Sequence, residues 1–251
     1  LHIDLAKEGW RASNKRYYFP QMISFISRRE KIKAIAVLNG APGFIGALKL
    51  FLNYNLSPVD QRRKADALEG RLPFTTLEVW HNFGLVPLKV LDETKKSLIK
   101  AQPLSSTKAA RFDTVLVLER DDAESTAVQG CRVARLRVIF RLPRTVTNRR
   151  GFQVKAPSNW PQEPLAYVTW YTHFKPSPDQ ATGMYRVEPA IASNGMPQGA
   201  IIPLSNIRQS CMLVPGRTSW DRNWNSENIL DECSSFFVNN LQTKYTYQTI
   251  Y

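Results

Sequence analysis

Apolar residues recur at helical spacing in the first part of this chain and alternate with polar residues in the rest. Within residues 2–14 they recur three or four positions apart, which predicts a short helix. A second helix is predicted to begin at Pro20 and end at Gly40, with an apolar side made of Met22, Phe25, Ile26, Ile32 and Ile35. Residues 55–71 are polar, with Arg62, Arg63 and Lys64 in a row, and predict a linker or an exposed helix.

From residue 72 the pattern is typical of short strands separated by turn residues. Strands are predicted within 72–83, 112–119, 133–142, 165–174, 183–191, 200–215 and 244–251, with a short helix running into a strand within 227–239. The fold class is therefore α+β and mainly β, with mostly antiparallel strands in a barrel or sandwich. We divide the chain into a helical segment (1–54), a linker (55–71) and a β-rich domain (72–251).

The strand predicted at 133–142 has the clearest alternation. Ala134, Leu136, Val138 and Phe140 fall on one face, and the other face carries basic residues. No acidic residue occurs from Cys131 to Gln162, and two more arginines follow in the next loop. A stripe of this kind can follow DNA phosphates, whereas solvated arginines on an exposed sheet are the simpler alternative. The predicted nucleic-acid-binding residues are Arg135, Arg137, Arg141, Arg149 and Arg150.

Charge supports a polyanionic partner, because 34 Lys and Arg against 21 Asp and Glu give a net charge of +13. DNA or chromatin is the expected partner, and neither a membrane nor a small-molecule substrate is expected. The apolar stretch 34–52 is broken by Asn39, Pro42, Lys49 and three glycines, which argues against a membrane span. Three cysteines without a CxxC pair predict buried, reduced thiols at Cys131, Cys211 and Cys233.

No catalytic, metal-binding or cofactor-binding residue is predicted. His2, His81 and His173 lack ligand spacing, and the acidic run at 119–125 has the composition of a hairpin tip. The turn NGAPGFIG at 39–46 is similar to the dinucleotide-binding turn of short-chain dehydrogenases, which leaves an NAD(P)-binding oxidoreductase as an alternative. The rest of the chain is predicted as successive strands and not as the alternating strands and helices of that family, which argues against it. The aromatic run at 167–174 predicts core packing, with base stacking or a histone-reading methyl-lysine cage around Tyr167 and Trp170 as alternatives.

Several segments together resemble the region C-terminal to the catalytic core in fungal Plavaka-type transposases of the CACTA superfamily. They include LHIDLAKEGWRASNKRYYFPQM, LPFTTLEVWHNF, FDTVLV, GCRVARLRVIF, LAYVTWYTHFKPSPDQATGMYRV, IIPLSNIRQSCMLVP and the tail NWNSENILDECSSFFVNNLQTKYTYQTIY. The resemblance implies a non-catalytic part of a DDE-type transposase that contributes DNA or chromatin binding in the nucleus, with other transposase domains as partners. No segment resembles the acidic catalytic triad, and residues 34–71 depart from the family. The pattern around PLSNIRQSCML is also faintly similar to bromo-adjacent homology modules, which contact chromatin.

Overall fold

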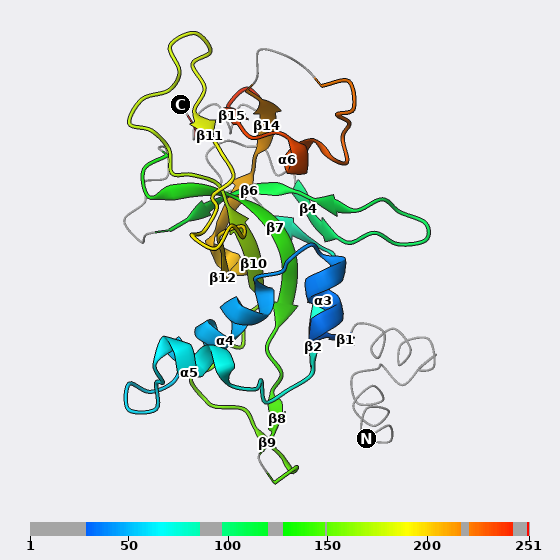
Figure 1. Ribbon diagram of the computed structural model, residues 1–251, viewed down its shortest axis with the longest axis vertical. Coiled ribbons are helices and arrows are strands. Elements are labelled where there is room, and N and C mark those ends of the chain that lie inside the picture. The colour runs from blue at the N-terminus through cyan, green and yellow to red at the C-terminus, as the bar shows by residue number, and fades with distance from the viewer. Residues whose placement is uncertain are drawn as a thin grey trace.

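The computed structural model describes residues 29–85, 97–119, 128–148, 150–216, 221–242 and 250. The helix predicted within 2–14, Arg149, and all of the strand predicted at 244–251 except Ile250 lie outside them. Figure 1 shows an elongated molecule with the largest sheet in the middle. Helices α4 and α5 and the β8–β9 hairpin lie toward one end, and α6, β11, β14 and β15 lie toward the other.

Three helices lie in the first part of the described chain: α3 (Ile32–Leu38), α4 (Phe44–Tyr54) and α5 (Lys64–Glu69). Gly40 has φ 55°, a left-handed conformation that suits glycine, and it follows the end of α3 as predicted. In the described part of the predicted second helix, only α3 is helical, and strand β1 (Arg29–Lys31) precedes it. The exposed helix predicted as one option for residues 55–71 is present as α5. None of the described helices is long and apolar enough to cross a membrane.

The main sheet has seven strands, all paired antiparallel. They are β1, β2 (Thr76–Trp80), β6 (Thr114–Leu118), β7 (Cys131–Arg141), β10 (Leu165–Trp170), β12 (Gly199–Pro203) and β13 (Ile207–Ser210). The eleven-residue strand β7 is central, because β10 lies along one edge while β2 and β6 share the other. The strands predicted at 112–119, 133–142 and 165–174 are therefore confirmed.

Smaller antiparallel sheets flank the main one. They comprise β3 (Asn82–Leu85), β4 (Ser97–Gln102) and β5 (Arg111–Phe112); β11 (Arg186–Val187), β14 (Met212–Pro215) and β15 (Phe236–Asn239); and the hairpin of β8 (Thr145–Thr147) and β9 (Gln153–Lys155). A 3-10 turn, η1 (Leu204–Asn206), and a short helix, α6 (Ile229–Glu232), complete the elements. The fold is α+β and mainly β, as predicted, and it is sandwich-like rather than a closed barrel.

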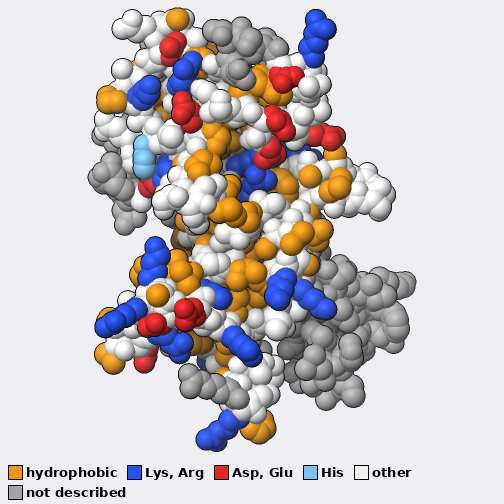
Figure 2. Space-filling view, in the orientation of Figure 1, with side chains coloured by type: hydrophobic (Ala, Val, Ile, Leu, Met, Phe, Trp, Pro, Cys, Tyr) orange, Lys and Arg blue, Asp and Glu red, His pale blue; other side chains and the backbone are white. Residues whose placement is uncertain are grey.

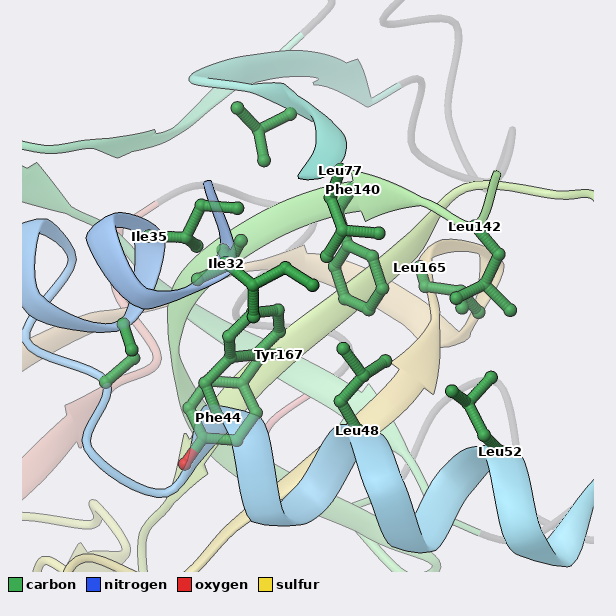
Figure 3. Packing of buried hydrophobic residues seen from close by; sticks show 14 of the residues in the cluster. Ile32, Ile35, Phe44, Leu48, Leu52, Leu77, Phe140, Leu142, Leu165 and Tyr167 are labelled. Carbon is green, nitrogen blue, oxygen red and sulfur yellow. The ribbon is translucent and has the colours of Figure 1, made fainter. Parts of the chain in front are cut away.

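Buried residues pack on both faces of the main sheet. On one face α3 and α4 contribute Ile35, Phe44 and Leu48, which pack against Phe140 and Tyr167 (Figure 3). The Phe44 ring meets both aromatic rings edge-on, with centroids 5.4 and 5.5 Å away. The helices before residue 55 and the strands after residue 72 thus share one hydrophobic cluster.

A register shift in the β7–β10 pair changes which residues share a face. Tyr167 lies opposite Val138 and Val168 lies opposite Leu136, so Arg137 is an extra residue in a β-bulge. Val138 and Phe140 consequently join the first cluster, while Leu136 and Ile139 join the second on the opposite face. The predicted single apolar face from Ala134 to Phe140 is therefore wrong beyond Leu136, because the bulge reverses the alternation.

Candidate functional site

Of the predicted binding residues, Arg135 is buried in the fold and Arg137 is mostly buried. Their side chains are only 7% and 12% exposed. Nη1 of Arg135 and Nη2 of Arg137 both donate to Oδ1 of Asp231 on α6, at 2.5 and 3.2 Å. Both guanidinium groups also lie over the ring of Phe112, 5.9 and 5.2 Å from its centroid. In Figure 2, Lys and Arg side chains are recessed beside acidic ones in the region that α6 occupies in Figure 1.

Electrostatics links the three charged groups of this cluster. Burial lowers the pKa of Arg137, and the charge of Arg135 beside it lowers this pKa further. Burial acts to raise the pKa of Asp231, but the hydrogen bond from Arg135 and the charges of both arginines outweigh it and hold this pKa below its ordinary value of 3.8. Asp231 is therefore ionised at neutral pH and neutralises part of the arginine pair.

The other three predicted binding residues lie elsewhere. Arg141 is half-buried, its backbone lies opposite that of Glu78 in the register of β2 and β7, and its guanidinium lies 5.3 Å from the centroid of the Trp80 ring. Arg150 is exposed on the β8–β9 hairpin, at the end of the molecule away from α6 (Figure 1), and Arg149 lies outside the described residues. The prediction that Arg135, Arg137 and Arg141 share one accessible strand face is therefore wrong, because the bulge and α6 separate and cover them.

The side chain of Arg132, from the same stretch without acidic residues, is also held by contacts within the fold. Its Nε donates to the carbonyl oxygen of Tyr171 at 2.6 Å, and its Nη atoms reach Glu119 and Gln198 at 3.3 and 3.1 Å. The guanidinium lies 5.0 Å from the centroid of the Trp170 ring. Arg132 thus joins the ends of several strands and is not available to a ligand.

The aromatic run is part of the core. Tyr167, Trp170 and Tyr171 are all buried, and Phe174 packs edge-on against Tyr185 with ring centroids 5.2 Å apart. The core-packing interpretation is confirmed for these rings. The rings of Tyr167 and Trp170 offer no open face to a methyl-lysine side chain or a base in the described structure.

The Gly-rich turn at 39–46 connects two helices, α3 and α4. A dinucleotide-binding turn needs a strand before its first glycine, and here the apolar run IKAIAVL is helical. Gly43 instead allows close packing, because a Cβ atom at this position would lie 2.7 Å from the Tyr167 hydroxyl oxygen. The geometry of the turn therefore gives the oxidoreductase alternative no support.

The cysteines have no site chemistry of their own in this structure. All three are buried, reduced thiols, as predicted. Burial raises the pKa of Cys131, and it raises that of Cys211 to about 12, so both thiols are protonated at neutral pH. Among the described residues, no group of three or more His, Cys, Asp or Glu side chains is arranged to hold a metal ion.

A second set of cations, which the sequence did not single out as one site, is exposed at the end of the molecule that carries α5 and the β8–β9 hairpin. Figure 2 shows Lys and Arg side chains gathered there. We call this surface the basic end; its members are Arg62, Arg63, Lys64, Arg71, Arg144, Arg150 and Lys155. The only signals in the sequence were the Arg62–Lys64 run and the acid-free stretch from Cys131 to Gln162.

Backbone contacts hold the parts of the basic end together. Asn53 on α4 accepts from the Arg62 amide at 2.9 Å and donates to the Arg62 carbonyl at 3.0 Å, which fixes the chain before α5. The Thr147 amide donates to the Pro73 carbonyl at 3.0 Å, which ties β8 to the segment that follows Arg71. These bonds bring together cations that lie some ninety positions apart in the sequence.

The carboxylates near the basic end are fewer than its cations. Asp60, Asp66 and Glu69 lie in or beside α5, and Asp60 accepts a hydrogen bond from the Ser57 hydroxyl at 2.6 Å. In the part of the chain that the structure describes, no salt bridge joins these carboxylates to a cation of the basic end. The side chains of these cations are therefore hydrated, and phosphate oxygens can replace the water around them.

Comparisons with protein-family models, curated proteins and solved structures found no match to this chain.

Proposed function

We propose that this chain is a non-catalytic part of a fungal DNA transposase, acting in the nucleus, and that it holds the DNA backbone, free or in chromatin, at the basic end. The observation that carries the proposal is the set of seven exposed cations around α5 and the β8–β9 hairpin. Arginine and lysine side chains of this kind contact phosphates without reading sequence, and they fix a protein on the duplex.

The proposal differs from the sequence-based prediction in where DNA binds. Arg135 and Arg137 are buried against Asp231 and would have to lose that partner before they could meet a phosphate. Arg62, Arg63 and Lys64 are exposed and lose only water. Phosphate binding at the basic end is therefore less costly than at Arg135 and Arg137, because no ion pair has to be broken there first.

Binding at the basic end is tested by reversing the three charges that begin α5. A variant with Arg62→Glu, Arg63→Glu and Lys64→Glu should bind a mixed-sequence duplex at least about ten-fold more weakly in a fluorescence-anisotropy titration. The fold should tolerate the change, because acidic residues near a helix N-terminus interact favourably with the helix dipole.

The matched control reverses three exposed charges elsewhere, with Lys108→Glu, Lys175→Glu and Arg222→Glu. It changes the net charge by the same amount and should leave most of the affinity intact. Equal losses in the two variants would mean that overall charge, and not the basic end, attracts DNA. Wild-type protein that binds no duplex at low salt would contradict the proposed function altogether.

The transposase kinship rests on the sequence segments quoted above and has its own test. If the chain is part of a transposase, the coding sequence adjoining Leu1 should encode an RNase H-like domain with an acidic metal-binding triad. Reading the genomic sequence upstream of this segment checks the prediction. An unrelated open reading frame there would contradict the kinship and leave DNA binding to be judged by the titration.

A further inference from the structure

The β8–β9 hairpin presents an aromatic side chain to solvent among its cations. Phe152 is 67% exposed, and Arg150 and Lys155 on the same hairpin are also exposed. Figure 1 shows the hairpin projecting from one end of the molecule. A single exposed apolar residue is common on protein surfaces, but the contacts of this hairpin set Phe152 apart.

The turn before Phe152 is ordered by one side chain. Oδ1 of Asn148 accepts from the backbone amides of Arg150 and Phe152, at 3.0 and 2.9 Å. The Asn148 amide in turn donates to the Phe152 carbonyl at 2.9 Å, and Gly151 adopts φ 85°, which suits glycine. The backbone of Phe152 is thus fixed on both its amide and its carbonyl side.

The base of the hairpin is anchored in the core. Val146 and Ala156 are buried in the first hydrophobic cluster, and the Ala156 amide donates to the Arg144 carbonyl at 2.9 Å. Trp160, just beyond, packs edge-on against Phe74 with ring centroids 5.9 Å apart. The core-packed base and the hydrogen-bonded turn fix the backbone that carries the aromatic ring, so little backbone conformational entropy is lost when a partner covers the ring.

We propose that Phe152 stacks on the face of a nucleobase while Arg150 and Lys155 hold the neighbouring phosphates. This inference rests on the proposed function and adds a base contact to it. A two-stranded ribbon is narrow enough to enter the major groove, and every base has a π-face on which an aromatic ring can stack. A base that is already unpaired is the favoured target, because a paired base must first be unstacked from its neighbours.

The test compares two DNA ligands: a fully paired duplex and a duplex of the same length with one unpaired base. Wild-type protein should prefer the duplex with the unpaired base, and Phe152→Ala should remove about ten-fold of affinity for that ligand with little change for the paired one. Phe152→Trp should keep the preference, and Phe152→Leu should lose it. Leu104→Ala, at a 69% exposed position between β4 and β5, is the matched control and should behave as wild type.

The possible outcomes separate this inference from the proposed function. If wild-type protein binds both ligands in a manner that depends on Arg62, Arg63 and Lys64, but Phe152→Ala changes neither affinity, only the base contact is overturned. Full retention of the preference by Phe152→Leu would indicate an apolar wedge and would also overturn stacking. Failure of the wild-type protein to bind either ligand would remove the proposed function and this inference together.

Discussion

Arg135 and Arg137 share a single carboxylate, which leaves one positive charge in excess within a largely buried cluster. The ring of Phe112 and the exposure of Asp231 to water lower the desolvation cost of this excess charge, but neither supplies a second negative charge. Removing one partner of a buried ion pair is more costly than replacing the whole pair, because the remaining charge stays desolvated. Loss of the Asp231 charge would therefore leave both guanidinium groups without this carboxylate.

Asp231→Asn should lower the free energy of unfolding by about 2 kcal/mol, as measured by urea denaturation at neutral pH. The neighbouring Glu232→Gln, which removes an exposed carboxylate of the same helix, is the control and should cost less than about 0.5 kcal/mol. A cost for Asp231→Asn no larger than that of the control would show that the negative charge of Asp231 contributes nothing to stability.

The stability difference between wild type and Asp231→Asn should also depend on pH. The pKa of Asp231 is lower in the folded protein than its ordinary value of 3.8, so the ionised carboxylate stabilises the fold above that value. This stabilisation is lost as the pH falls through the lowered pKa of the folded state. The stability difference between wild type and Asp231→Asn should thus be constant near neutrality and shrink below about pH 4, and a difference that grows in acid would contradict the assignment.

At the scale of elements, alternation and turn residues were enough to predict most strands. The strand at 133–142, the short helix leading into a strand at 227–239 and the glycine that follows α3 all follow from local patterns, and all are present. The bulge at Arg137 could not be predicted, because it depends on how β10 pairs with β7. Local sequence identified the cations, but only tertiary packing determines which of them α6 covers.

Tyr167 shows how such packing acts between elements. Its hydroxyl group lies against Gly43, in the turn between α3 and α4, and against Gly199 at the start of β12. A Cβ atom on Gly43 would meet only the hydroxyl oxygen closely, since the ring carbon Cζ is 3.9 Å away. A Cβ atom on Gly199 would also meet Cζ and Cε2, at 2.7 and 2.9 Å. The two glycines therefore respond differently to loss of the hydroxyl group.

Gly43→Ala should cost about 1–3 kcal/mol of stability through overpacking, and Tyr167→Phe should remove most of that cost in the double variant. Gly199→Ala should be destabilising to a similar or greater degree, and Tyr167→Phe should not rescue it, because the ring itself is in the way. Thermal unfolding of the single and double variants measures both couplings. Equal rescue at the two positions would contradict the described packing.

At the scale of the whole molecule, the seven exposed cations of the basic end lie away from α6. The region around α6 exposes charges of both signs, with Asp221, Glu227, Asp231 and Glu232 beside Arg186 and Arg222. Under the proposed function the basic end would meet DNA first, because a local excess of cations is attracted to phosphates.

The most direct measurement is the salt dependence of duplex binding by the wild-type protein and by the variant reversed at Arg62, Arg63 and Lys64. Each phosphate contact adds about 0.9 to the slope of log affinity against log salt. We predict a steep wild-type slope, a slope shallower by about 2 to 3 in the α5 variant, and an unchanged slope in the control reversed at Lys108, Lys175 and Arg222. Identical slopes in the wild type and the α5 variant would contradict DNA binding at the basic end.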